Sequence, residues 1–501
     1  MRMGRPTINA ALRFEGRSWT RAEFAAWVDA EVETLAALGV APGDRVAVLA
    51  LNHPRTLALL FACARLGAML APLNWRLAGP ELRWILDDAA PRLLFVDGSA
   101  PNVGRPGTTV LAIEPSPNEV LAKISGPAVE APDPIALSAA RRPLLQGSPK
   151  GKGALLLVYT SGTAGRPKGA VLTAAAIEAN AALSRDMHGL SASDHVLTVL
   201  PLFHVGGLNI QTVPALLAGA TITLHARFDP AATIAAVERD RPTLTVLVPA
   251  TLQAILAHSA WRSADFSSLR AITTGSTVVQ PAITAPFIAR GIPVLQVYGS
   301  TETAPLAIYT PIGKPYDPTS TGHPGLGVCA RAVDDHGNPV PPGRPGEVCL
   351  QGPQLFQGYW RNPAATDEAF QDGWYRTGDI GTEAPDGSWT VHDRRKNVIV
   401  SGGENIYPAE IERVLHGMPE IAEAAVVGRP DPRWQEVPEA HVVLRPGTSC
   451  TEADIIAHVH TQLARFKAPR RVHFVAELPR NAMGKVQHAA LAHGSASGMV
   501  R

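Results

Sequence analysis

The sequence predicts an α/β fold with a large multi-sheet N-terminal domain and a small α+β C-terminal domain. Its 501 residues exceed what one compact core accommodates, and about 150 residues per domain suggests roughly three structural units. Between residues 45 and 96, short apolar segments alternate with helix-like ones, a pattern typical of parallel strands joined by helices. Beyond residue 346 the pattern changes to short β segments and turns. The two parts of the chain are therefore expected to differ in architecture.

The first elements follow from local patterns. Thr20-Arg21-Ala22-Glu23 matches a capping box, which predicts a helix that runs to about Leu38 and stops at Gly39. Strand, helix, strand, helix and strand are then predicted at residues 45–51, 56–66, 69–73, 80–87 and 92–96. Residues 98–153 are rich in Pro, Gly and Ser and are expected to be peripheral. Further strands are predicted at residues 154–159, 195–200, 221–224, 243–248, 271–274 and 294–298.

A charged cluster, Asp393-Arg394-Arg395-Lys396, marks the predicted domain boundary. We expect a first domain at residues 1–394 and a second at residues 395–501. Pro408 suits a first helical turn, because its missing N–H would be unpaired there anyway. The second domain is predicted to contain strands near residues 398–400, 424–427, 441–444 and 472–475, and helices near residues 408–416 and 452–464.

Composition excludes several classes of protein. The 45 basic and 44 acidic residues give a formal net charge of +1, so no overall field attracts nucleic acid or an anionic membrane. The four cysteines form no C-x-x-C pair, which argues against a zinc site or disulfide framework and favours a cytoplasmic location. No signal peptide is evident, and the longest apolar region, residues 57–73, is shorter than the ~20 residues of a membrane span. Peripheral membrane contact and oligomeric state stay open.

A glycine- and hydroxyl-rich loop follows the strand predicted at residues 154–159. Glycines let backbone N–H groups wrap an anion, hydroxyls donate further hydrogen bonds and a lysine adds positive charge, so the expected ligand is a polyphosphate. It is not a Walker A loop, because Lys168 lies between Pro167 and Gly169. The predicted phosphate-binding residues are Thr160, Ser161, Gly162, Thr163, Ala164, Gly165 and Lys168.

This loop resembles the phosphate-binding loop of the acyl-adenylate-forming (AMP-binding) superfamily, and later motifs match that superfamily in order along essentially the whole chain. The resemblance implies an ATP-dependent acid–thiol ligase, most similar to acyl-CoA synthetases. In such enzymes a carboxylate and MgATP give acyl-AMP and pyrophosphate, and a thiol then displaces AMP. The implied cofactors are ATP, Mg²⁺ and CoA. Ala164 departs from the family, since many relatives have a second Thr at this position.

The segment Tyr298-Gly299-Ser300-Thr301-Glu302 resembles the family's adenylate-binding motif. An aromatic ring and glycine backbone can flank a base, and Mg²⁺ prefers oxygen ligands such as Glu302. The resemblance implies that Asp379 accepts both ribose hydroxyls and that Arg394 adds a contact. It also implies adenine contacts from Gly275 and Ser276, and a Mg²⁺ site at Thr160 and Glu302. By itself, Asp379 would more often be a turn or cap residue.

Near the C-terminus, Lys485 matches the family's catalytic lysine. It is expected to stabilise charge on the phosphoryl oxygens while the substrate carboxylate attacks. Lys396 matches the hinge about which the small, mobile domain rotates between the two steps. That rotation is implied to withdraw Lys485 and to present a CoA-binding segment, Ser401, Gly402 and Gly403.

The acyl pocket is predicted from two segments with mainly small and apolar residues. By resemblance they supply His204, Val205, Gly206, Gly207 and Thr274, and Val297, directly before Tyr298, is added to the pocket. His204 is expected close to the carboxylate as a second catalytic residue; His204 as an ordinary core histidine stays open. Such a pocket favours a fatty or aromatic monocarboxylic acid. The C-terminal motif also resembles that of malonyl-CoA synthetases, but Val297 replaces their arginine, and an unpaired second carboxylate is costly to bury. The alternatives are an acyl-AMP ligase that loads a carrier-protein thiol and a malonyl-CoA synthetase-like enzyme.

Overall fold

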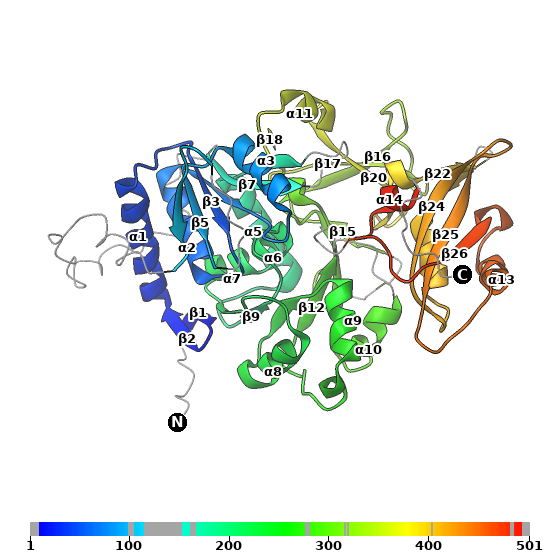
Figure 1. Ribbon diagram of the computed structural model, residues 1–501, viewed down its shortest axis with the longest axis horizontal. Helices are drawn as coiled ribbons and strands as arrows, with labels where there is room; N and C mark the ends of the chain where they lie inside the picture. The colour runs from blue at the N-terminus through cyan, green and yellow to red at the C-terminus, as the bar shows by residue number, and fades with distance from the viewer. Residues whose placement is uncertain are drawn as a thin grey trace.

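The computed structural model describes residues 10–98, 105–114, 153–160, 167–275, 281–314, 317, 320–401, 404–480 and 485–492. Within these ranges the strands form four sheets, and helices cover the two largest (Figure 1). The helices are α1 (Arg21–Ala37), α2 (Pro54–Leu66), α3 (Gly79–Ala89), α5 (Ala174–His188), α6 (Val205–Asn209), α7 (Thr212–Ala218), α8 (Pro230–Asp240), α9 (Pro249–Ala257), α10 (Pro281–Ile288), α11 (Pro363–Ala369), α12 (Pro408–Leu415), α13 (Glu452–Gln462) and α14 (His488–Ala492).

The first large sheet has the order β18-β8-β7-β4-β3-β5-β6. Strands β4, β3, β5 and β6 pair in parallel and β7 pairs in parallel with β4, as the alternating pattern predicted. Strand β8 is antiparallel to β7, so these two form a hairpin at one side of the sheet. The strands are β3 (Arg45–Leu49), β4 (Met69–Pro72), β5 (Leu93–Val96), β6 (Thr109–Ala112), β7 (Ala154–Thr160), β8 (Lys168–Thr173) and β18 (Gly358–Tyr359).

The second large sheet has the order β15-β14-β13-β12-β11-β9-β10-β1-β2. Its centre is parallel from β10 to β13, and antiparallel strands close both edges. The strands are β1 (Ala10–Phe14), β2 (Arg17–Thr20), β9 (His195–Thr198), β10 (Thr221–Leu224), β11 (Leu244–Val246), β12 (Ala271–Gly275), β13 (Val294–Tyr298), β14 (Ile308–Tyr309) and β15 (His323–Pro324).

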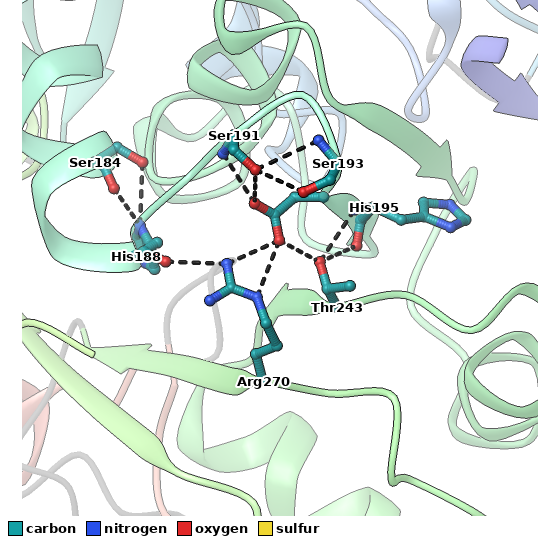
Figure 2. Close-up of polar contacts among 8 residues, drawn as sticks. Ser184, His188, Ser191, Ser193, His195, Thr243 and Arg270 are labelled. Atoms are coloured by element: carbon teal, nitrogen blue, oxygen red, sulfur yellow. Dashed lines mark hydrogen bonds and ion pairs between the residues drawn. The ribbon is translucent and has the colours of Figure 1, made fainter. Parts of the chain in front are cut away.

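A buried carboxylate aligns the starts of three central strands of this sheet (Figure 2). Asp194, just before β9, accepts hydrogen bonds from Ser191, from Thr243 before β11 and from Arg270 before β12. Arg270 also donates to the backbone carbonyl of His188, at 3.1 Å. These contacts fix the end of α5 relative to β12.

Two antiparallel sheets follow along the chain. The first contains β16 (Cys329–Val333), β17 (Gly346–Gln351), β19 (Phe370–Gln371), β20 (Trp374–Glu383) and β21 (Trp389–Arg394). The second contains β22 (Ile399–Ser401), β23 (Glu404–Ile406), β24 (Ile421–Asp431), β25 (Gln435–Leu444) and β26 (Arg471–Phe474). The sheet of strands β22 to β26 and helix α13 form one end of the molecule, opposite α1 (Figure 1). Helix α12 packs against β24 of this sheet. The apolar cores of this end draw only on residues from Ile399 onward.

Local sequence explains why the first helices begin and end where they do. Thr20 and Glu23 exchange both capping-box hydrogen bonds at the start of α1, which confirms the prediction. Helix α2 starts at Pro54 and ends at Leu66. Gly67, which follows, has a φ of 70°, the left-handed conformation that glycine adopts readily. Almost every residue of α2 is buried. The apolar stretch is therefore a core helix followed by a strand, and among the described residues no helix meets the length and hydropathy of a membrane span.

Helices α1 and α2 share a fully buried ion pair. Arg55 Nε lies 2.7 Å from Glu31 Oε1, and both side chains have no solvent exposure. Trp27 Nε1 donates to the same carboxylate at 3.1 Å, and Arg55 donates to the backbone carbonyl of Ile113. Each charge is thus compensated by several partners, as buried charges require.

Glu31→Ala is expected to lower the free energy of unfolding by about 3–5 kcal/mol, because it leaves the Arg55 guanidinium buried without its counter-charge. The measurement is the urea unfolding midpoint of the variant and the wild type. Glu33→Ala, at an exposed position on the same helix, is the matched control and should change stability by less than about 0.5 kcal/mol. Equal midpoints for Glu31→Ala and Glu33→Ala would contradict the expectation.

Candidate active site

Asp379, Arg394 and Tyr298 meet where the second large sheet contacts the β20–β21 hairpin. Asp379 and Arg394 are direct partners in the antiparallel register of β20 and β21. Arg394 Nε lies 2.7 Å from Asp379 Oδ1, and the Tyr298 hydroxyl donates to Asp379 Oδ2 at 2.7 Å. The structure therefore brings together three residues that the sequence assigned separately to the adenylate site.

The Asp379 carboxylate is only 7% exposed. Burial raises its pKa above the ordinary value, while Arg394 and Tyr298 oppose the increase by stabilising the charged form. Asp379 in turn raises the pKa of Arg394. The result is a buried acceptor held between a phenol and a guanidinium, and a carboxylate of this kind can receive two neighbouring hydroxyls.

The structure describes the residues at the two ends of the predicted phosphate loop. Thr160 ends β7 and Lys168 begins β8, and the two residues are partners in the hairpin register. Lys168 is thus the first residue of a strand, whereas the sequence had placed it in a loop. The predicted residues Ser161, Gly162, Thr163, Ala164 and Gly165 lie outside the described residues.

Lys168 connects to the predicted magnesium ligand through an aromatic ring. Its ammonium lies 5.1 Å from the centre of the Tyr359 ring, and the Tyr359 hydroxyl donates to Glu302 Oε1 at 2.8 Å. Glu302 lies in a short 3₁₀ turn, η3 (Thr301–Thr303), directly after Ser300. No cluster of three metal-ligating side chains occurs in the described ranges. One carboxylate near a phosphate loop nevertheless fits Mg²⁺, which is usually held by one or two carboxylates and by substrate phosphates.

Two glycines at predicted AMP-binding positions pack directly against neighbouring backbone. A Cβ on Gly299 would collide with the carbonyl oxygen of Pro305, and a Cβ on Gly275 would collide with that of Val297. Gly275 and Val297 are partners in the parallel register of β12 and β13. Only glycine therefore fits at these two predicted AMP-binding positions, while Ser276 lies outside the described residues.

The predicted acyl segment forms a tight turn into helix α6. His204 precedes this helix, and Val205, Gly206 and Gly207 are its first residues. A Cβ on Gly207 would collide with the carbonyl oxygen of Pro201, whereas a Cβ on Gly206 would meet no atom of the described residues within 4 Å. Gly206 therefore borders open space, and Gly207 is packed against backbone.

His204 lies among positive charges. Burial, the largest cause, together with Lys485 and Arg76 lowers the pKa of His204 to about 4. The imidazole is consequently neutral near pH 7 and can donate one hydrogen bond without carrying charge. Thr274 and Val297, the other predicted acyl-pocket residues, lie on the adjacent ends of β12 and β13.

Lys485 reaches this site from the C-terminal part of the chain. Desolvation lowers the pKa of its ammonium, Arg394 lowers it further, and Asp379 opposes both effects. The side chain keeps access to solvent. A residue 106 positions after Asp379 and 281 after His204 thus interacts electrostatically with both.

The structure describes only some of the residues predicted for the hinge and for CoA binding. Lys396 lies in the 3₁₀ turn η4 (Arg395–Asn397), which joins β21 to β22. Ser401 ends β22, while Gly402 and Gly403 lie outside the described residues.

Sequence reasoning missed two residues of the site. Tyr359 bridges Lys168 and Glu302, and Arg76 lies close enough to His204 to lower its pKa. Arg76 also stacks over Trp75, with its guanidinium 4.9 Å from the ring centre. The position of Arg76 next to Trp75, between the strand predicted at residues 69–73 and the helix predicted at residues 80–87, was the one local indication. Nothing adjacent to Tyr359 pointed to Glu302.

Two family models match the chain. The model described as AMP-binding enzyme matches residues 3–360, and the one described as AMP-binding enzyme C-terminal domain matches residues 410–485. Together they account for most of the sequence.

Similar proteins include an indoleacetate–CoA ligase from Aromatoleum aromaticum, 46% identical over 95% of this chain and 93% of the relative. A feruloyl-CoA synthase from Amycolatopsis is 40% identical over 95% of this chain and 94% of the relative. Among solved structures, ATP-bound MatB from Rhodopseudomonas palustris has a TM-score of 0.86 and 29% identity, covering 98% of this chain and 96% of that one.

These matches confirm the predicted fold class and the prediction of an AMP-forming acid–thiol ligase that uses ATP, Mg²⁺ and CoA. The chain belongs to the AMP-binding enzyme family.

Proposed function

We propose that this enzyme activates an aromatic monocarboxylic acid with ATP and transfers the acyl group to CoA. The observation that supports the proposal is that Lys485 interacts electrostatically with both Asp379 and His204, a hydroxyl acceptor and a neutral imidazole from distant parts of the chain. The acids named for the two similar ligases, indoleacetate and ferulate, are both aromatic monocarboxylates.

The first step forms the acyl adenylate. A carboxylate oxygen of the acid attacks the α-phosphorus of ATP, the bond to the β-phosphate oxygen breaks, and pyrophosphate leaves. Lys485 stabilises the negative charge that builds on the phosphoryl oxygens. His204 donates to the carboxylate and orients it. Glu302 and Thr160 would hold Mg²⁺, which would neutralise phosphate charge.

The contacts around Asp379 support a role for this residue in holding the nucleotide. Its carboxylate accepts the ribose hydroxyls, and Arg394 and Tyr298 keep it charged and oriented. Gly275, Gly299 and Ser300 border the base and α-phosphate together with Ser276 and Thr301. Lys168 and the loop that precedes it, Thr160 to Gly165, bind the β- and γ-phosphates.

The second step forms the thioester. The thiol sulfur of CoA attacks the acyl carbonyl, the thiol proton is lost, and the C–O bond to AMP breaks. We place the boundary between a first domain, residues 1–394, and a lid, residues 395–501, with Lys396 as the hinge. Rotation of the lid replaces Lys485 with the segment Ser401 to Gly403, whose glycines leave room for pantetheine.

Three features favour an aromatic acid with one carboxylate. Gly206 borders open space, which suits a broad, flat acyl group. Val297 supplies no counter-charge for a second carboxylate, and the neutral His204 supplies none either.

ATP and CoA as substrates, and the absence of disulfides among four free cysteines, fit a cytoplasmic enzyme.

The test is AMP release by the purified enzyme with MgATP and a panel of acids, each with and without CoA. The panel contains acetate, palmitate, malonate, benzoate, indole-3-acetate, 4-hydroxyphenylacetate and ferulate. CoA-dependent AMP release is expected to be fastest with an aromatic member. Faster turnover of palmitate or malonate would contradict the acid class, and AMP release that requires a carrier-protein thiol would contradict CoA as acceptor.

A further inference from the structure

The segment that leads into strand β18 is hydrogen-bonded to two elements of the proposed nucleotide site. The N–H of Phe356 donates to the backbone carbonyl of Glu302 in η3, at 2.8 Å. Strand β18 itself pairs with β8, the strand that begins at Lys168, and places Tyr359 opposite Ala170. A short stretch of backbone therefore joins η3 to β8.

Tyr359 has a well-defined position within this stretch. Its backbone N–H donates to Thr366 Oγ1 at 2.9 Å, and Thr366 Oγ1 donates to the carbonyl of Asn362 at 3.0 Å. The ring of Phe356 packs edge-on against the ring of Tyr359, with centres 4.9 Å apart. The Tyr359 side chain is half-buried. Its orientation is thus set by contacts to both the backbone and the ring.

Tyr359 contacts two residues of opposite charge with different parts of its side chain. The hydroxyl donates to Glu302 Oε1 at 2.8 Å, and the ammonium of Lys168 lies 5.1 Å from the ring centre. Burial, followed by the charge of Glu302, raises the pKa of Tyr359, so the hydroxyl keeps its proton and remains a donor. The ring attracts the ammonium through its electron-rich face.

Lys168 and Glu302 do not pair with each other. Among the residues that the structure describes, Lys168 forms no ion pair, and Tyr359 is the one side chain that hydrogen-bonds to the carboxylate of Glu302. Glu302 is buried, and opposite charges attract strongly where water is excluded. A direct ion pair between the two residues would occupy the groups that are proposed to bind phosphate and Mg²⁺.

We infer that Tyr359 is a positioning residue, which keeps Lys168 and Glu302 apart and orients them towards the phosphates and Mg²⁺, respectively. This inference rests on the proposed function, in which Lys168 and Glu302 take these two roles. Tyr359 itself is assigned no contact with ATP or the metal. The hydroxyl acts on Glu302 and the ring acts on Lys168, so the two contacts can be removed one at a time.

The experiment measures equilibrium binding of α,β-methylene-ATP, an analogue that cannot form acyl-AMP, by titration calorimetry. Each protein is titrated once with Mg²⁺ present and once in EDTA, with no acid added. The wild-type enzyme is expected to bind the analogue more tightly when Mg²⁺ is present. The ratio of the two dissociation constants then reports the contribution of the metal site.

Tyr359→Phe removes the hydroxyl and keeps the ring beside Lys168. We expect this variant to bind the Mg²⁺ complex at least about tenfold more weakly, the usual effect of losing a partner that orients a metal-binding group, while its metal-free affinity changes less than about twofold. Tyr359→Leu removes the ring as well. It should also weaken metal-free binding, by at least about threefold, because Lys168 loses its cation–π contact and becomes free to pair with Glu302.

Tyr309→Phe is the matched control. Tyr309 is a buried tyrosine that donates to a carboxylate oxygen, Asp186 Oδ2, at the same distance of 2.8 Å, and it has no assigned part in the site. The variant should keep the wild-type affinity with and without Mg²⁺. An equal loss of Mg²⁺-dependent binding in Tyr309→Phe would overturn the inference, because any buried phenol hydroxyl would then have the same effect.

Three other results would overturn it. The first is a folded Tyr359→Phe enzyme that binds the Mg²⁺ complex within about twofold of the wild type. The second is an equal loss of affinity with and without Mg²⁺, as a purely structural hydroxyl would give. The third is a wild-type enzyme that gains no affinity from Mg²⁺. None of these measurements involves the acid, whereas the proposed function fails if no aromatic acid supports CoA-dependent AMP release.

Discussion

Lys485→Ala is expected to lower acid-dependent ATP–pyrophosphate exchange by about 10²–10³-fold, the usual cost of removing one group that stabilises transition-state charge. Lys485 interacts electrostatically with Arg394, Asp379 and His204, which supports the proposal that its ammonium acts where acyl-AMP forms. Exchange of radiolabelled pyrophosphate into ATP measures this step alone.

The same variant separates the two half-reactions. With acyl-AMP supplied, the CoA-dependent release of AMP should fall by less than about tenfold, because Lys485 is proposed to act only in the first step. Lys314→Ala, an exposed lysine outside the site, controls for loss of positive charge and should leave both rates unchanged. An equal loss in both half-reactions would show that Lys485 does not act selectively on adenylation.

The second large effect is expected for Asp379→Ala, which should lower kcat/KM for ATP by more than about 10²-fold. The substitution removes the proposed acceptor for the ribose and leaves Arg394 and Tyr298 without the carboxylate that both of them contact. Asp379→Asn keeps the shape and removes the charge, so its loss should be smaller.

Steady-state kinetics with ATP and with the acid varied in turn checks this expectation. The KM for ATP should rise far more than the KM for the acid. Asp372→Asn, in the exposed turn that leads into the same strand, is the control and should behave as the wild type. A folded Asp379→Asn enzyme with an unchanged KM for ATP would exclude Asp379 as a nucleotide ligand.

The elements that sequence predicted well are those set by local physics. Helix α1 follows from its capping box. Helix α2 was predicted at residues 56–66 from its apolar run, and in the structure it begins two residues earlier, at Pro54. Asp379 shows where local preference fails. Its residue type and neighbours favour a turn, yet it lies within the ten-residue strand β20, because pairing with β17 and β21 overrides local preference.

The site was predicted as separate motifs, and its internal contacts were not. The Asp379–Arg394 pair depends on the register of a hairpin, which a bulge between Ile380 and Gly381 shifts. The contact between Tyr359 and Glu302 joins residues 57 positions apart. No local pattern encodes either one. The first depends on the register of β20 and β21, and the second depends on how β18 lies against η3.

The two glycines of helix α6 bear on how this enzyme could acquire new substrates. A side chain at position 207 meets the backbone of Pro201, so mutation there damages the fold before it alters selectivity. Position 206 faces space, and a Cβ added there meets no atom of the described residues within 4 Å. If this helix lines the acyl pocket as proposed, natural divergence or laboratory evolution towards shorter acids can proceed through substitution of Gly206. Substitution of the adjacent Gly207 is not available for this purpose.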